Sequence, residues 1–181
     1  MAYDLARWGL GLLIFIILLI IVLVTSKKKG RDIMISLFVS IIISSSLLLY
    51  PVENHLYSFK SVEQIYNYRH HEDLVTYAEC DYGVLTVGAD ASSDTVYYAF
   101  SKDEKGYHLL QSDNITYRSS KDGIYIIKTF GPQMIILTKI NNSAYNGEPF
   151  KSAGHDYFYT VIDKDADLSL LTYAGMGVSL V

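Results

Sequence analysis

Two short segments of the sequence concentrate the His, Asp and Glu side chains from which a metal site could be built. The first begins with His70 and His71 and continues through two acidic residues. Zinc needs side chains that converge in space, whereas neighbouring residues of an extended chain point to opposite sides. The spacing therefore favours a solvated helix end, with basic side chains near the negative end of the helix dipole, over a zinc site.

The second segment places carboxylates at alternate positions, Asp163, Asp165 and Asp167, as the start of a calcium loop does. The pattern then departs from such a loop. Leu168 stands where glycine is needed, and Ala174 stands where the twelfth position should supply a bidentate Glu. The segment is more typical of a polar hairpin turn, and we expect neither a metal nor another cofactor in this protein.

Tyrosine is the most unusual feature of the composition, since 14 of the 16 tyrosines lie after residue 51. Several alternate along predicted strands, and we select four as candidate binding residues: Tyr117, Tyr125, Tyr157 and Tyr159. A tyrosine ring buries a large area while its hydroxyl still finds a polar partner, which suits a binding surface. Tyrosine also has a high strand propensity, so strand formation alone gives a second explanation of the enrichment.

Motifs for catalysis are missing from the sequence. It contains no nucleophile elbow, metalloprotease helix, phosphate-binding glycine loop or Cys-x-x-Cys pair. We therefore predict that the protein is not an enzyme, and the alternative is an exported, hydrolase-like enzyme whose site is assembled from distant residues. The single cysteine, Cys80, cannot form an intrachain disulfide; it is either an exposed thiol that could cross-link two copies or a buried one.

The elements that carry these residues divide into an apolar and a polar block. The chain has 181 residues, of which 50% are hydrophobic, and a mean hydropathy of +0.20, which is high for a soluble domain of this size. Residues 8–24 and 33–50 contain no charged side chain, and each run is close to the ~17 to 25 residues that span a bilayer. We predict two transmembrane helices that form a hairpin over residues 1–51.

The loop at 25–32 indicates the orientation of this hairpin. It holds Lys27, Lys28, Lys29 and Arg31, and cytoplasmic loops collect Lys and Arg near helix ends. The same basic cluster stands where a signal peptide would have its cleavage site, so we expect the first helix to stay attached. We predict a multi-pass protein of the cell membrane with a cytoplasmic loop and both termini outside; the alternative is an inverted hairpin.

Three serines recur every four residues on the second predicted helix, at Ser36, Ser40 and Ser44. Side chains at this spacing share one side of a helix, and small ones let another helix approach closely. The spacing predicts a packing seam. The seam contacts either the first helix of the same chain, which we favour, or a partner subunit or second copy.

The polar block predicts an α+β domain at residues 61–181, after a linker at 52–60. Ser61 and Gln64 have the spacing of a capping box, which predicts one short helix over 61–69. Period-two runs of β-branched and aromatic residues follow, and they predict about eight strands. Without long intervening helices these strands can form a mainly antiparallel meander.

Charge separates the two blocks and limits the partners. Residues 1–51 carry a net charge of +3 and residues 52–181 a net charge of −7. The acidic domain disfavours nucleic acid as a partner. The layout resembles that of many membrane proteins of Gram-positive bacteria, a resemblance that transfers no functional residue. We predict a membrane-anchored extracytoplasmic binding or accessory module that contacts the lipid bilayer and a protein partner or a second copy.

Overall fold

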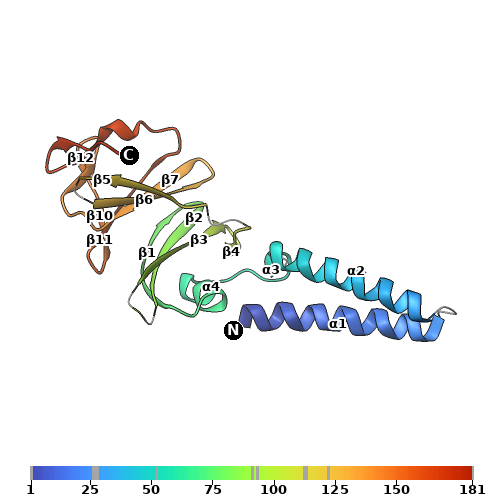
Figure 1. Ribbon diagram of the computed structural model, residues 1–181. Coiled ribbons are helices and arrows are strands. Elements are labelled where there is room, and N and C mark those ends of the chain that lie inside the picture. The colour runs from blue at the N-terminus through green and yellow to red at the C-terminus, as the bar shows by residue number, and fades with distance from the viewer. Residues whose placement is uncertain are drawn as a thin grey trace. The chain divides into compact units, whose positions relative to one another are not determined.

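The computed structural model describes residues 2–25, 29–51, 53–90, 92, 94–111, 114–121 and 123–180 (Figure 1). The chain forms two compact units, which are Met1–Tyr57 with Tyr68–His70, and Ser58–Asn67 with His71–Val181. The fold is α+β, with a small helical part and antiparallel sheets.

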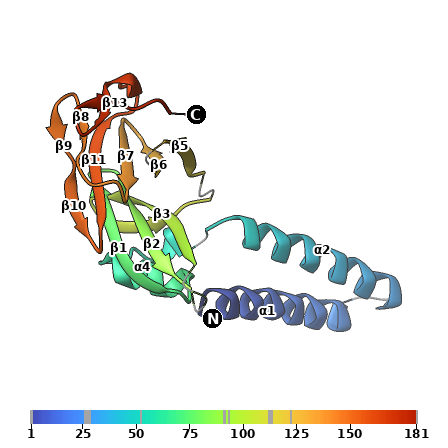
Figure 2. The same cartoon turned by 60° about the vertical axis from the view of Figure 1, so that its left-hand side comes forward.

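The first unit contains two long helices and one short helix: α1 (Ala2–Thr25), α2 (Lys29–Leu49) and α3 (Glu53–Leu56). α1 and α2 lie side by side and antiparallel (Figures 1 and 2). Both predicted apolar runs are therefore helical. α2 begins within the predicted loop, at Lys29, and α3 lies within the predicted linker. Residues Ser26–Lys28, which carry part of the basic cluster, lie outside the described residues.

Among the described side chains, one helix is long and apolar enough to cross a membrane. It is Arg7–Thr25, with a mean hydropathy of 3.0. Its place near the N-terminus fits a membrane anchor or a signal sequence. The side chains of Leu47–Leu49, which the prediction of a second span counted, lie outside the described residues.

The predicted short helix is α4 (Val62–Arg69), of which Val62–Asn67 belong to the second unit. The Gln64 amide donates to Ser61 Oγ at 3.2 Å, and Gln64 Oε1 accepts from the Lys60 amide at 3.0 Å. These bonds satisfy donors at the start of the helix and confirm the capping signal. Ile65 and Tyr66 are fully buried on its apolar side.

Four strands form the first sheet as a simple meander: β1 (Asp73–Cys80), β2 (Gly83–Ala89), β3 (Thr95–Asp103) and β4 (Gly106–Leu109). For these four strands the arrangement is the antiparallel meander that the sequence predicts. α4 packs against one face of the sheet at Gly88. A Cβ atom on Gly88 would lie only 1.9 Å from the Tyr66 hydroxyl oxygen, too close for any side chain larger than that of glycine. Gly88 is thus the residue that lets the helix approach the sheet.

Five strands form the second sheet in the order β10-β11-β7-β6-β5. They are β5 (Thr116–Ser120), β6 (Gly123–Phe130), β7 (Gln133–Thr138), β10 (Lys151–Gly154) and β11 (Tyr157–Asp163). The order departs from a meander, since β11 lies between β10, the strand before it in the sequence, and β7, which is distant in the sequence. Asp122, which directly precedes β6, lies outside the described residues.

A small third sheet has the order β13-β12-β8-β9 and explains why about eight strands was too low a prediction. Its strands are β8 (Ser143–Tyr145), β9 (Glu148–Pro149), β12 (Leu171–Tyr173) and β13 (Met176–Gly177), with a 3-10 turn η1 (Leu168–Leu170) before β12. Strands of two or three residues cannot establish a period-two pattern. Turn residues with positive φ, such as Asn142, Asn146 and Ala174, separate them.

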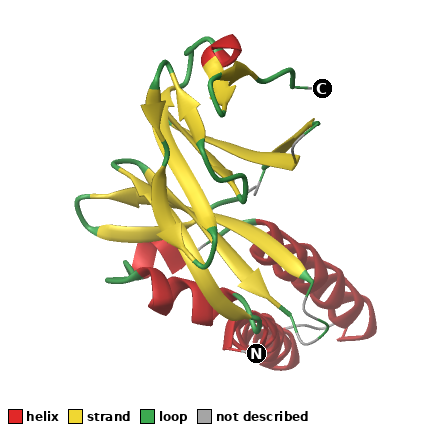
Figure 3. Cartoon of the chain, turned by 90° about the vertical axis from the view of Figure 1, so that its left-hand side faces the viewer, coloured by secondary structure: helices red, strands yellow, loops and turns green. Residues whose placement is uncertain are grey.

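Figure 3 shows the strands of the sheets in yellow. Two apolar cores of described residues pack against these sheets. One core lies between the first and second sheets and includes Leu85, Val87, Ile135 and Leu137. The other covers the opposite face of the second sheet and includes residues of the third, such as Leu171. The second sheet therefore has side chains packed against both of its faces. As a result, a tyrosine of this sheet can be buried whichever face its ring lies on.

Candidate functional site

Two of the four selected tyrosines are core residues. Tyr125 is 0% exposed, in the core beneath the third sheet, and its hydroxyl lies 3.2 Å from Ser143 Oγ. Tyr157 is 2% exposed, in the core between the first two sheets. This corrects the selection of both as surface residues: a ring without exposed area cannot contact a partner.

The other two selected tyrosines lie at different places on the domain. Tyr159 is half-buried and packs against the inter-sheet core, where it lines a hollow of about 630 Å³ beside β1 and β10. Tyr117, on β5, is 55% exposed. Tyr117 is therefore the selected tyrosine with the largest surface available to a partner.

Tyr117 belongs to a ring cluster at one open edge of the sandwich formed by the first and second sheets. The Tyr97 ring, from β3, makes edge contacts with Tyr117 at 6.1 Å and with Tyr157 at 6.5 Å between centroids. The Tyr97 and Tyr157 hydroxyls are 3.4 Å apart. Lys139 Nζ lies 4.8 Å from the centre of the Tyr157 ring, within cation–π range. The cluster thus joins one cation to three rings from three strands.

A hollow of about 410 Å³, here called the tyrosine pocket, opens beside these rings. Its lining residues are Tyr97, Tyr117, Gly123, Ile124, Ile126, Lys139 and Ile140. Burial, with the hydroxyl of Tyr157 as a second cause, raises the pKa of Tyr97 above its usual value. The Tyr97 hydroxyl therefore keeps its proton at neutral pH and stays a hydrogen-bond donor.

The lining of the tyrosine pocket defines the ligand chemistry that it can accept. Isoleucine and tyrosine supply apolar and aromatic walls, Lys139 supplies a cation, and the part of the lining that the structure describes contains no carboxylate. Such walls suit a ligand with an apolar body and an anionic or hydrogen-bond-accepting group. Sequence reasoning missed Lys139, because it follows the end of β7 with no motif, and only the packing of β3 beside β5 and β6 gives it this setting.

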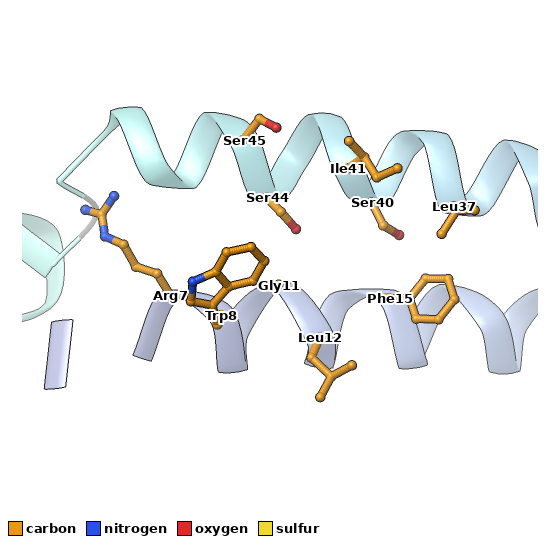
Figure 4. Close-up of a pocket in the computed structure, with 10 residues that line it drawn as sticks. All are labelled: Arg7, Trp8, Gly11, Leu12, Phe15, Leu37, Ser40, Ile41, Ser44 and Ser45. Atoms are coloured by element: carbon orange, nitrogen blue, oxygen red, sulfur yellow. The ribbon is translucent and has the colours of Figure 1, made fainter. Parts of the chain in front are cut away.

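A second hollow lies within the first unit, between α1 and α2, with a volume of about 420 Å³ (Figure 4). Ser40 and Ser44 point from α2 toward α1, and Trp8 and Phe15 lie on the facing side of α1. A Cβ on Gly11 would lie 2.7 Å from Ser44 Oγ, so the two helices approach closely at this glycine.

The three predicted seam serines have different surroundings. Ser36 and Ser40 are buried, and the Ser40 hydroxyl donates to the Ser36 carbonyl at 2.7 Å. Ser44 is half-buried opposite Gly11. These contacts lie within the chain, as in the alternative that we favoured, and whether a further helix uses the same side stays a prediction.

An ion pair closes one end of the first unit. Arg7 is 4% exposed; its Nε and Nη2 donate to the two carboxylate oxygens of Glu53 at 3.1 and 2.9 Å, and Nη2 also donates to the Tyr50 carbonyl at 2.9 Å. The Tyr68 hydroxyl donates to Glu53 Oε1 at 3.1 Å. Burial acts to raise the pKa of Glu53, but the hydrogen bonds and charge of Arg7 outweigh it and hold that pKa below its usual value. The sequence held a signal for this pair, namely opposite charges at the ends of two adjacent apolar runs.

The candidate metal ligands do not converge. His70 is half-buried, while His71 is exposed and its amide donates to Glu72 Oε2 at 3.0 Å. Asp167 caps η1 by accepting the Ser169 amide at 2.9 Å. Asp163 is the last residue of β11, and Asp165 lies in the turn after it. The part of the chain that the structure describes holds no group of three His, Cys, Asp or Glu side chains that could bind a metal ion.

Cys80 is buried in the inter-sheet core at the end of β1. Burial raises the pKa of its thiol, so the reactive thiolate form is disfavoured. Of the two alternatives for this cysteine, the structure supports the buried thiol.

Comparison of the chain with protein-family models, with curated proteins and with solved structures found no match.

Proposed function

We propose that this protein is a membrane-anchored binding or accessory module whose second unit captures a partner outside the cell. In this proposal α1 and α2 cross the membrane as a hairpin, the loop between them is cytoplasmic, and both termini are outside. The tyrosine pocket carries the proposal, because it combines an exposed ring, apolar walls and a cation in one hollow of the surface.

The side chains of α2 support a second membrane crossing. On the sides of α2 that do not contact α1, Ile35, Phe38 and Ile42 are exposed, although they are large and apolar. In water such a surface would favour association or aggregation, whereas in lipid it needs no cover. The 21 residues of α2 are also enough to span a bilayer.

The direction of the hairpin rests on the charges of its loop. Arg31 and the three lysines before it are the densest basic cluster of the chain, and cytoplasmic loops collect such residues. The acidic second unit then lies outside. An accessory role fits the polar groups of the hairpin. A channel or transporter usually needs ionisable side chains inside its spans to form a conducting path. Arg7, in contrast, is engaged in an ion pair with Glu53.

The orientation can be tested by thiol labelling in intact cells. In a Cys80→Ala background, we expect Gly30→Cys to resist a membrane-impermeant thiol reagent and Ser92→Cys to react with it. Opening the cells should make Gly30→Cys reactive, which controls for a cysteine that is merely hindered. Labelling of Gly30→Cys alone in intact cells would contradict the orientation and the extracytoplasmic location together.

The binding role can be tested by affinity purification in mild detergent followed by mass spectrometry. We expect a partner that is recovered with the natural chain and lost with the double variant Tyr117→Ala/Lys139→Ala. A matched variant, Tyr82→Ala/Lys151→Ala, removes an exposed tyrosine and an exposed lysine from other places on the domain and should retain the partner. Equal recovery from all three chains would contradict a binding role for the tyrosine pocket.

A further inference from the structure

The outer edge of β5 is open. β5 is the last strand of the second sheet, and it pairs with β6 in unbroken register from Thr116↔Ile127 to Ser120↔Gly123. Its first four residues are exposed. No strand of the described ranges pairs with its other side, so every second residue presents an amide and a carbonyl outward.

A pocket flanks this edge on each face of the sheet. Tyr117 pairs with Ile126, and both line the tyrosine pocket, which therefore lies on one face of β5. Arg118, the next residue, points to the opposite face, where it lines a hollow of about 380 Å³, here called the arginine pocket. The other residues of the arginine pocket are Leu168, Ser169, Val178 and Leu180.

This arrangement matches the way an added strand presents its side chains. Successive residues of a strand point to opposite faces, so a peptide paired with β5 would direct alternate side chains into the two pockets. In recognition by strand addition the main chain provides affinity and the alternating pockets provide specificity. A single pocket would not suggest this mode, whereas a pair on opposite faces of one edge does.

Charge identifies the occupant. Among the described residues that line them, each pocket has one basic residue, Lys139 or Arg118, and neither has an acidic one. Residues 114–140 contain four basic residues and one acidic residue, within a block of net charge −7. The β5 edge is thus a basic region on an acidic domain, and its complement is acidic with apolar side chains.

The same charges argue against a second copy of β5 as the occupant. Two β5 edges brought together would place two copies of Arg118 and of Lys121 in one short strand pair, and like charges across paired strands are destabilising. We propose that β5 accepts an extended, acidic polypeptide segment of a partner as an added strand, with its side chains alternating between the tyrosine and arginine pockets. This inference rests on the proposed function and specifies the class of partner.

The test uses the full chain in lipid nanodiscs and a synthetic probe, the acetylated and amidated peptide Val-Glu-Glu-Val-Val-Glu-Glu-Val, which places Val and Glu on both faces of a strand. We expect saturable binding in fluorescence anisotropy and amide shifts in β5. The same peptide with Lys in place of Glu should not bind. Charge reversal by Arg118→Glu or Lys139→Glu should weaken binding about tenfold each, while Lys151→Glu on β10 should have little effect.

Backbone methylation of the probe separates strand addition from simple charge attraction. Two versions are needed, methylated on the odd or on the even amides, because only one set of amides faces β5 in an added strand. We expect one version to lose binding and the other to keep it. Equal binding of both versions, no binding of the acidic probe, or self-association of the chain through β5 would each overturn the proposal.

The failure of this inference can be told apart from failure of the proposed function. If the probe does not bind while partner capture still depends on Tyr117 and Lys139, the strand-addition inference is wrong and the binding module stands. If labelling puts the domain inside the cell while the probe still binds β5, the location is wrong and the inference about the edge stands.

Discussion

The second sheet has two edge strands, β10 and β5, which differ in register and in the contacts that cover them. β10 contains a register irregularity between Ser152 and Gly154, and the Thr76 hydroxyl of β1 donates to the Ala153 carbonyl. β5 has regular register and exposed side chains. Proteins commonly close sheet edges with irregular register, charges or covering segments, because an open edge pairs with other chains. Here β10 is closed by contacts within the domain, whereas β5 is protected from pairing only by its charged side chains.

The hollows beside the two edges differ in the same way. The hollow beside β10 is lined by the acidic Glu63 and by His155. The described charged residues that line the two pockets beside β5 are basic. We infer that the contacts of β10 stabilise the domain and that the open edge of β5 is available for association.

The largest expected effect is on folding stability, and it concerns the buried ring of Tyr157. Tyr157→Ala removes a large side chain that is 2% exposed, and we expect a loss of about 3–5 kcal/mol in the free energy of unfolding. Tyr157→Phe removes only the hydroxyl near Tyr97 and should cost about 0.5–1.5 kcal/mol. Urea unfolding of the full chain in detergent, followed by tyrosine circular dichroism, measures both. A stable Tyr157→Ala variant would show that the ring is not a core residue.

The next effect distinguishes the closed edge from the open one. Thr76→Val keeps the shape of the side chain but leaves the Ala153 carbonyl without this donor, at a cost of about 1–3 kcal/mol. Thr116→Val, an exposed position of β5, is the matched control and should change stability by less than about 0.5 kcal/mol. Amide hydrogen exchange should show faster exchange in β10 for the first variant and no local change for the second. Equal effects would mean that β10 is not closed by Thr76.

A third prediction tests whether charge protects β5. Arg118→Val removes a charge from the open edge, and we expect concentration-dependent association of the chain in detergent with a change in folding stability below about 0.5 kcal/mol. Lys151→Val makes the same replacement on β10, where the edge is already closed, and should leave the chain as it was. Sedimentation analysis at several protein concentrations compares the two. Association of both variants would remove the distinction between the edges.

The sequence predicts the longer elements well because they are long enough to show a period. The α4 cap at Ser61 and Gln64 and the hairpins of the first sheet follow directly from local pattern. The segment 141–155 contains three strands of two to four residues, too short for a period-two pattern. Their pairing depends on turns at residues such as Asn142, Asn146 and His155, which adopt positive φ.

The candidate site was harder to predict for a different physical reason. Alternation identifies a core face only when the other face meets water. The second sheet is covered on both faces, so Tyr125 and Tyr157 occupy different cores, and neither is exposed. Lys139 and Tyr97 come together only through the packing of two sheets, which no local pattern encodes. The serines at 36, 40 and 44 were identifiable because their spacing is a property of one helix.

The smallest expected effect concerns the wall of the arginine pocket and depends on pH. Asp167 accepts the backbone amide of Ser169 at 2.9 Å, and this bond, with the Ser169 hydroxyl as a second cause, holds the pKa of Asp167 below its usual value. A lowered carboxyl pKa means that the cap is fully present above the unfolded-state pKa and is lost as the pH falls through the folded-state pKa. We therefore expect the Ser169 amide resonance to shift in acid, with η1 loosening beside β5 while β10 is unaffected. Asp167→Asn keeps an acceptor that does not titrate and should abolish the pH dependence without removing the cap. If the Ser169 resonance of the Asn variant shifts as much as that of the natural chain, another group is responsible, and the pocket wall does not depend on Asp167.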